Sequence, residues 1–245
     1  MCKIKILHMY PDILGLYGDS GNIEILKYRC SMRGIKYHVD EYKIGSDIKD
    51  FSQYDLIYLG GGADIEQQII ADELLKNREN LMNAYKSGCF LFLICGGYQL
   101  MGQFYRDSNG IEIPGLKLFD YYTEASTNKS VRCIGNIIIE SDLNGVKTKV
   151  IGFENHGGMT KNVKTPFGKV LYGNGNCAES KDEGYFEKNV IATYLHGPLL
   201  SKNPLVADYI IHYCLSRNSN EKITLPLLDD SIEEKCRETL INRFL

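Results

Sequence analysis

The chain lacks a long apolar run, a strong excess of one charge and a recognisable secretion signal. No apolar stretch approaches the roughly 20 residues that a membrane-spanning helix needs. The 28 Lys and Arg residues nearly balance the 31 Asp and Glu residues, and the net charge of -3 gives no electrostatic signature of nucleic-acid or anionic-membrane binding. Residues 1–6 lead directly into a strand-like segment, without the apolar stretch of a signal peptide. We therefore expect a cytoplasmic protein.

Paired-cysteine and phosphate-binding motifs are missing as well. Eight cysteines are scattered along the chain, without a C-x-x-C pair or a histidine at zinc-ligand spacing. In a cytosolic chain most of them should be small buried apolar residues, and we expect no metal site. The chain has no Gly-x-x-x-x-Gly-Lys-Ser/Thr loop and no Gly-x-Gly-x-x-Gly opening a helix, so we expect no nucleotide site in it.

What the 245 residues do contain is an ordinary globular composition, 44% hydrophobic and 24% charged, with a regular alternation in the first half. Strand-like and helix-like segments alternate along this half, which is typical of a parallel sheet with helices on both faces. The expected strands are 5–9, 36–42, 55–59 and 90–94. The expected helices are 23–33, 65–86 with a potential break near residue 76, and a short one that ends at about residue 102.

The second half differs in pattern, since residues 111–193 are richer in glycine and in short strands. These look like antiparallel hairpins added to the sheet, and the late helices are expected at 203–215 and 230–244. We find no internal repeat and no low-complexity linker. The predicted fold is α/β, a flavodoxin-like three-layer sandwich with a mostly parallel central sheet and added antiparallel strands in the second half, in a single domain over residues 1–245. Candidate strands are 132–140, 146–153, 169–172 and 189–194.

The most informative segment is the apolar run 90–94 that ends at Cys95. A run without polar residues indicates a strand buried on both faces. Gly96 and Gly97 then allow a sharp turn into a segment with helical spacing. Cys95 would lie at the carboxyl end of the strand, where a helix start favours a thiolate. The pattern is that of a nucleophile elbow with Cys in place of Ser.

A cysteine nucleophile needs a base, and His196 is the leading candidate. It follows the apolar segment 190–195 and precedes Gly197 and Pro198, so it also ends a strand. Two side chains at the same edge of one sheet can meet despite their distance in the sequence. His156 is the competing candidate. A structural role is expected for the other histidines, His8, His38 and His212.

The glycine triplet 60–62 follows a strand that should lie beside the Cys95 strand. Its backbone N–H groups could point to the same place as the N–H of Gly96, and together they would form an oxyanion hole. The alternative is that the triplet is only a flexible turn.

These residues resemble the class I (triad-type) glutamine amidotransferase domains. The resemblance rests on Cys95-x-Gly97-x-Gln99, on the glycine-rich loop one strand earlier and on a histidine about 100 residues later. Most of that class has Gly two residues before the nucleophile, where this chain has Leu93, and Glu two residues after the histidine, where it has Pro198. The missing Glu points to the cobyric-acid-synthase-like branch.

Within that branch the chain is similar to the glutaminase subunits of lipid II isoglutaminyl synthase (GatD type). The resemblance covers about residues 4–215, and its last segment is the most specific. It rests on four segments: Leu16-Tyr17-Gly18-Asp19-x-Gly21-Asn22, Gly60-Gly61-Gly62-x-Asp64, Gly152-Phe153-Glu154-Asn155-His156-Gly157-Gly158 and Tyr194-Leu195-His196-Gly197-Pro198-Leu199-Leu200-x-Lys202-Asn203-Pro204.

The resemblance implies catalytic roles for four residues. Cys95 would attack the side-chain amide of L-glutamine, and His196 would take the thiol proton and return it to the departing ammonia. Gly62 and Gly96 would supply the oxyanion N–H groups.

For several other residues near the site, more than one role is consistent with the sequence. Arg132 would grip the substrate α-carboxylate with two hydrogen bonds, or else form a surface ion pair at a strand start. Gln99 would orient the elbow helix or contact substrate. The loop 154–156 is expected to have a structural or site-lining role. What orients His196 is not visible; a partner chain or a backbone carbonyl could do so.

Ammonia released from glutamine must reach an activated acceptor, so the resemblance implies a second, ATP-using polypeptide. It would be a Mur-ligase-like synthetase subunit (MurT type) in a heterodimer, binding ATP and magnesium and amidating the D-glutamate of the lipid II stem peptide. No cofactor is expected in this chain. The alternatives are an acceptor in a corrinoid or pyridoxal pathway, a related intracellular cysteine hydrolase, or a degenerate subunit that only scaffolds its partner.

Overall fold

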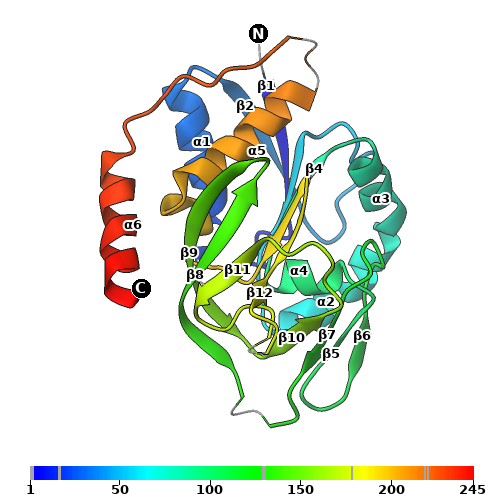
Figure 1. The fold of residues 1–245 in the computed structure, drawn as a ribbon. Helices are drawn as coiled ribbons and strands as arrows, with labels where there is room; N and C mark the ends of the chain where they lie inside the picture. The colour runs from blue at the N-terminus through cyan, green and yellow to red at the C-terminus, as the bar shows by residue number, and fades with distance from the viewer. Residues whose placement is uncertain (1–2, 16–17, 129–130, 178, 218, 220) are drawn as a thin grey trace.

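A six-stranded central sheet organises the computed structural model, which describes residues 3–15, 18–128, 131–177, 179–217, 219 and 221–245. Its strand order is β13-β14-β4-β3-β1-β2 (Figure 1). Strands β2, β1, β3, β4 and β14 run parallel, and β13 pairs antiparallel with β14. The bounds are β1 Lys3–Met9, β2 Lys36–Tyr42, β3 Leu56–Leu59, β4 Phe90–Ile94, β13 Tyr185–Glu187 and β14 Val190–Thr193.

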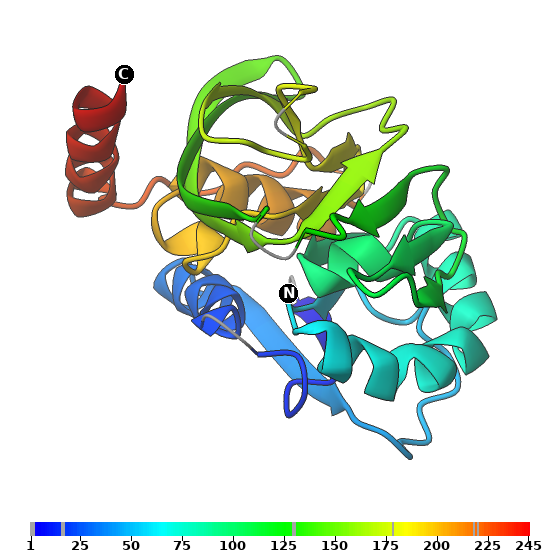
Figure 2. The ribbon, with the colours of Figure 1, turned by 90° about the horizontal axis from the view of Figure 1, so that it is seen from below.

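Helices cover both faces of this sheet. Figure 2 shows α1 and α5 on one face and α2, α3 and α4 on the other. The structure confirms the predicted α/β class with a mostly parallel central sheet. The bounds are α1 Gly21–Met32, α2 Asp64–Lys76, α3 Arg78–Lys86, α4 Gly96–Leu100 and α5 Pro204–Arg217.

Burial of the strands follows from this layering. Every residue of β3, β4 and β14 is buried, because each has a strand on both sides and helices on both faces. The outer strand β2 alternates instead, with a charged or polar residue at most of its more exposed positions. The predicted break in the long helical segment is also present, at Asn77 between α2 and α3.

The middle of the chain differs from the expected hairpins on the central sheet. Only β13 adds an antiparallel strand there, while the other described strands form two separate four-stranded sheets, β10-β7-β5-β6 and β12-β11-β8-β9. Strands β8 and β9 pair with each other over their whole length and form a long hairpin. Strand β11 pairs with the other edge of β8. The bounds are β5 Phe104–Arg106, β6 Glu112–Pro114, β7 Tyr122–Ala125, β8 Cys133–Leu143, β9 Val146–His156, β10 Gly158–Lys161, β11 Gly168–Tyr172 and β12 Asp182–Glu183.

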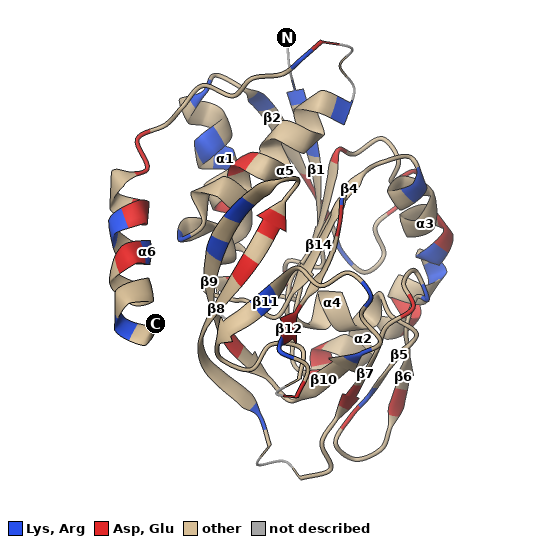
Figure 3. Cartoon of the chain, viewed as in Figure 1, with Lys and Arg blue, Asp and Glu red and all other residues tan. Residues whose placement is uncertain are grey.

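The last helix, α6 (Ser231–Phe244), lies beside the β8–β9 hairpin (Figure 1). Arg237 donates to the carbonyl of Lys149, and the ring of Phe244 contacts Tyr172. Figure 3 shows basic and acidic residues on this helix and on both halves of the chain, in keeping with the small net charge. Within the described ranges, no helix has the length and apolar character needed to cross a membrane.

Candidate active site

Cys95 occupies a sharp turn between β4 and α4. Its backbone has φ 49° and ψ -102°, a region that non-glycine residues rarely adopt. Two backbone hydrogen bonds hold it, from Cys95 N to the carbonyl of Thr193 at 2.8 Å and from Gln99 N to the Cys95 carbonyl at 2.9 Å. A Cβ at Gly97 would stand 2.6 Å from the Leu59 carbonyl oxygen. The glycine therefore lets the elbow helix approach β3 closely.

His196 reaches the same edge of the sheet from the end of β14. Two backbone hydrogen bonds with Phe153 of β9 fix its segment, at 2.9 and 3.1 Å. A Cβ built on Gly61 would lie 3.1 Å from Cys95 Cβ and 3.1 Å from His196 Cε1. The two side chains thus meet above Gly61, because β3, β4 and β14 are neighbouring parallel strands that end at one edge.

Asp19 is a member of this cluster that the sequence did not reveal. Its Oδ2 lies 2.7 Å from Nδ1 of His196, and both side chains are buried. In the sequence, residues 18–22 had the composition of a loop and helix cap, and α1 does begin at Gly21. The available signal was that this loop follows β1, which pairs with β3. The neighbouring motif residues Leu16 and Tyr17 lie outside the described residues.

The surroundings of His196 favour its protonated form. Burial alone lowers the pKa of the imidazole, but hydrogen bonds with Asp19 and Cys95, together with the charges of these two groups, raise it to about 10. A protonated imidazole beside a cysteine stabilises the thiolate. His196 can therefore hold a proton beside the Cys95 sulfur before any substrate binds.

The predicted oxyanion donors lie next to the nucleophile. Gly96 follows Cys95 directly, and Gly62 lines the same cavity as Cys95. Among the described residues, neither backbone N–H donates a hydrogen bond to another group of the protein. Both N–H groups are therefore available to donate hydrogen bonds to the negative oxygen of a tetrahedral intermediate.

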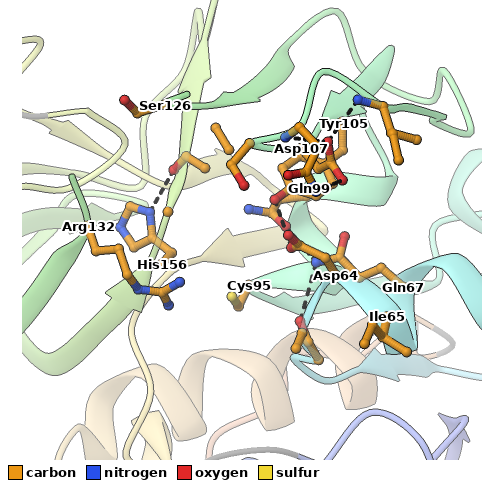
Figure 4. Close-up of a pocket in the computed structure, with 18 of the residues that line it drawn as sticks. Asp64, Ile65, Gln67, Cys95, Gln99, Tyr105, Asp107, Ser126, Arg132 and His156 are labelled. Atoms are coloured by element: carbon orange, nitrogen blue, oxygen red, sulfur yellow. Dashed lines mark hydrogen bonds between the residues drawn. The ribbon is translucent and has the colours of Figure 1, made fainter. Parts of the chain in front are cut away.

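A cavity of about 550 Å³ opens above Cys95. Figure 4 shows Cys95 between two walls, one with Arg132 and His156 and the other with Asp64, Gln67 and Gln99. The first wall comes from the β8–β9 hairpin and the second from α2 and α4. The two halves of the chain thus enclose the cavity together.

Arg132 is exposed on the cavity wall. Its guanidinium donates to Oδ1 of Asn155 at 2.9 Å, and it forms no ion pair with a described residue, so the expected alternative of a surface ion pair is not what the structure shows. On the opposite wall, Asp64 accepts a hydrogen bond from the hydroxyl of Tyr105 at 2.8 Å. The cavity therefore presents a positive and a negative group on facing sides.

Gln99 is buried behind the elbow. Its Oε1 accepts from Gln67 at 2.9 Å and its Nε2 donates to the hydroxyl of Tyr194 at 3.1 Å. The amide thereby joins α4 to α2 and to the end of β14. This arrangement favours the orienting role predicted for Gln99, although the residue also lines the cavity.

His156 lines the cavity but its ring is engaged elsewhere. Nδ1–H donates to the carbonyl of Gly158 at 2.7 Å, and the ring stacks on Tyr194 with centroids 3.7 Å apart. Burial lowers the pKa of His156 to about 4, so the ring is neutral at neutral pH. The neighbouring Glu154 accepts backbone hydrogen bonds from Asn174 and Gly175. The 154–156 segment is built into the wall.

The remaining histidines lie away from Cys95. His8 packs against Tyr58, His38 contacts Asp40 on exposed β2, and His212 lies 3.1 Å from the Ile223 carbonyl. No cluster of three or more metal-ligating side chains occurs among the described residues.

An elbow cysteine and a histidine at adjacent ends of a parallel sheet define the class of protein, and the comparisons agree. Residues 5–204 match the model of the CobB/CobQ-like glutamine amidotransferase domain. The chain belongs to this family and is a glutamine-hydrolysing enzyme.

Its particular relatives include two of about its own length. The chain is 39% identical to the GatD subunit of lipid II isoglutaminyl synthase (glutamine-hydrolysing) from Staphylococcus aureus strain N315, over 99% of this chain and 97% of the relative. It is 37% identical to the GatD subunit from Streptococcus pneumoniae, over 96% and 90%. These matches confirm the resemblance noted in the sequence.

Two more distant matches complete the comparison. A cobyric acid synthase from Limosilactobacillus reuteri strain DSM 20016 is 32% identical over 73% of this chain and 34% of its own length. A crystal structure of a glutamine amidotransferase superimposes with a TM-score of 0.52 at 14% identity, covering 85% of this chain and 98% of that one. The structural match supports the fold alone.

Proposed function

We propose that this chain is the glutaminase subunit of a lipid II isoglutaminyl synthase. It would hydrolyse L-glutamine and pass ammonia to a Mur-ligase-like synthetase subunit, which amidates the D-glutamate of the stem peptide. The observation that supports lipid II as the acceptor is the share of each relative's length that matches this chain. The two GatD subunits match over 97% and 90% of their own lengths, whereas the cobyric acid synthase matches over 34%.

The proposed chemistry begins with the thiolate of Cys95. Its sulfur attacks the side-chain carboxamide carbon of glutamine, and the N–H groups of Gly62 and Gly96 bind the oxygen that becomes negative. His196 gives its Nε2 proton to the departing ammonia. A thioester with Cys95 remains. Water, deprotonated by His196, hydrolyses the thioester and releases glutamate, which restores the thiolate and the imidazolium.

Substrate recognition follows from the charges on the two walls. Arg132 would bind the α-carboxylate of glutamine with a charge-assisted hydrogen bond. Asp64, facing it across the cavity (Figure 4), would bind the α-ammonium. A free amino acid carries both charges, whereas a glutamine inside a peptide carries neither, so the site suits free L-glutamine.

The synthetase partner completes the reaction in this proposal. This chain has no phosphate-binding motif, so ATP and magnesium are assigned to the partner, and the chain itself needs no cofactor. Ammonia has to arrive unprotonated, which requires a direct passage between the two subunits. We therefore propose a cytoplasmic heterodimer that meets lipid II through its synthetase subunit.

A second acceptor is favoured by one observation, the 32% identity to a cobyric acid synthase over 73% of this chain. In that case the ammonia would amidate a corrinoid carboxylate.

The test uses glutamine labelled with ¹⁵N in its side-chain amide. The chain is co-purified with its synthetase partner and supplied with ATP, magnesium and lipid II. We expect lipid II to gain one ¹⁵N amide on its D-glutamate, read by mass spectrometry. The matched Cys95→Ser complex should fail with glutamine and still amidate with ammonium chloride. Glutamine hydrolysis without labelled lipid II would overturn the proposed acceptor.

A further inference from the structure

We propose that Asp19 is the positioning residue of the glutaminase site, so that the chain carries a complete Cys-His-Asp triad of its own. The inference rests on the proposed hydrolysis by Cys95 and His196. Most members of the glutamine amidotransferase class that this chain resembles have a Glu two residues after the histidine, where this chain has Pro198. Here the carboxylate comes from the loop after β1.

The contact itself has the geometry of a charge-assisted hydrogen bond. His196 Nδ1 and Asp19 Oδ2 are 2.7 Å apart, with exposed fractions of 2% and 0%. A carboxylate accepts only, so Nδ1 carries the proton that it donates. The other ring nitrogen, Nε2, is then the one that exchanges a proton with Cys95. Asp19 thereby selects the tautomer that the reaction needs.

The loop that presents Asp19 is fixed by buried hydrogen bonds. The Asp19 carbonyl accepts from the hydroxyl of Tyr58 at 2.7 Å and from Asn22 N at 2.9 Å. The side chain of Asn22 donates to the Tyr58 hydroxyl and accepts from Leu200 N at 3.0 Å. Asn22 thus ties the loop of Asp19 to the segment after His196.

The same two segments pack so closely that a side chain is excluded between them. A Cβ on Gly21 would stand 2.7 Å from Cγ of Pro198. Pro198 stands at the sequence position where most of the class has Glu, and its ring packs against Gly21 in the segment that follows Asp19.

All three proposed triad residues surround one backbone position. A Cβ on Gly61 would lie 3.2 Å from Asp19 Oδ2, besides its contacts of 3.1 Å with Cys95 and 3.1 Å with His196. Gly61 follows β3, which lies between β1 and β4 in the sheet. The topology thus brings the loop after β1 and the ends of β4 and β14 to one point.

The charge of Asp19 is available to His196. Its second oxygen, Oδ1, is buried and has no hydrogen-bond partner among the described residues. The other titratable groups that interact with the ring are Cys95, His156 and Glu183. Burial lowers the pKa of His156 to about 4 and raises that of Glu183 to about 8, so both are mainly neutral at pH 7. Asp19 is then the main anionic partner of the imidazolium besides the thiolate.

The test compares Asp19→Asn with Asp12→Asn, an exposed aspartate near the same loop. Asparagine keeps the shape but removes the charge. We expect kcat for glutamine hydrolysis to fall by up to about 10⁴-fold in Asp19→Asn, because the imidazole loses the carboxylate that selects its tautomer, while KM changes little. The pH midpoint for alkylation of Cys95 by iodoacetamide, followed on its own peptide by mass spectrometry, should rise, because the imidazolium loses its anion. Asp12→Asn should match the wild type.

Each readout is made on the subunit alone and on its complex with the synthetase. An unchanged kcat and alkylation midpoint in Asp19→Asn would overturn the proposal. Restoration of the wild-type rate by the partner would overturn it too, since the third residue would then come from the partner. If Asp19→Asn impairs hydrolysis but lipid II is not amidated by the wild type, the inference stands and the proposed acceptor falls.

Discussion

The carboxyl edge of the parallel sheet and the antiparallel half of the chain contribute to the site in different ways. Cys95 and His196 come from the ends of parallel strands and Asp19 from the loop between β1 and α1, and their exposed fractions are 7%, 2% and 0%. Asp19 and His196 lie within hydrogen-bond distance of each other, and a Cβ built on Gly61 would lie 3.1–3.2 Å from all three side chains. Arg132, from the antiparallel half, is exposed and has one hydrogen bond with a described partner, Asn155.

The difference matches what each region has to do. Reacting atoms must be held to within a fraction of an ångström, because small displacements cost large factors in rate. Neighbouring parallel strands provide this precision, since their hydrogen bonds fix where each strand ends. A guanidinium on a flexible stem needs less precision to attract a carboxylate. We therefore expect changes at the parallel edge to act on kcat and changes on the antiparallel wall to act on KM.

The strongest test of the parallel edge removes the nucleophile. Cys95→Ser should lower kcat for glutamine hydrolysis by about 10⁴-fold or more, because serine lacks the acidity that the elbow and His196 exploit. The thermal midpoint should stay within a few degrees of the wild type. Cys236→Ser, at an exposed cysteine of α6, is the control and should be fully active. Retained turnover in purified Cys95→Ser would refute the assignment.

A second experiment distinguishes an amidotransferase from other cysteine hydrolases. Labelling of Cys95 by diazo-oxo-norleucine that is prevented by glutamine indicates an amidotransferase, and no labelling indicates the other class.

A single methyl group tests how tightly the edge is packed. In Gly61→Ala, the new Cβ would press on all three side chains at 3.1–3.2 Å, and we expect kcat to fall about 100-fold. Gly157→Ala on the antiparallel wall is the matched change, because its Cβ meets only Arg132 at ordinary contact distances of 3.6 Å and more. Steady-state kinetics should show a near-normal kcat there. Equal losses in the two variants would contradict the contrast between the regions.

The wall is tested through Arg132. In Arg132→Met, the lost charge-assisted hydrogen bond should raise KM for glutamine about 10- to 100-fold, while kcat changes less. Arg243→Met, at an exposed arginine of α6, is the control. A fall in kcat with constant KM would assign Arg132 to the reacting centre instead of the binding wall.

The same contrast explains what the sequence could predict. Alternating strands and helices are local patterns, so the parallel sheet and the meeting of Cys95 with His196 at its edge could be inferred. The contact of Asp19 could not, because residues 18–22 resemble an ordinary helix cap and their packing against residues 196–200 is a tertiary feature. The separate β8–β9 sheet was missed for a similar reason: a strand pattern does not show which strand will be its partner.

The smallest expected effect concerns stability in acid, and it arises in both regions. Burial lowers the pKa of His8 on β1 and of His156 on β9, each to about 4. Below about pH 6.5 the unfolded chain binds protons at these positions that the folded chain does not. The free energy of unfolding should therefore decrease as the pH falls from about 6.5 towards 4, by at most about 1.4 kcal/mol per pH unit for each histidine. Buried Glu183 offsets part of this decrease, because burial raises its pKa to about 8 and the folded chain then holds a proton there that the unfolded chain releases above about pH 4.5.

Urea unfolding at several pH values measures this slope. His8→Gln removes one of the two groups and should make the slope shallower. His196 does not interfere in this range, because its raised pKa keeps it protonated in the folded state while the unfolded chain is protonated too. A slope in His8→Gln equal to that of the wild type would show that His8 takes up its proton without unfolding, and that the parallel half is less tightly closed around β1 than around Cys95.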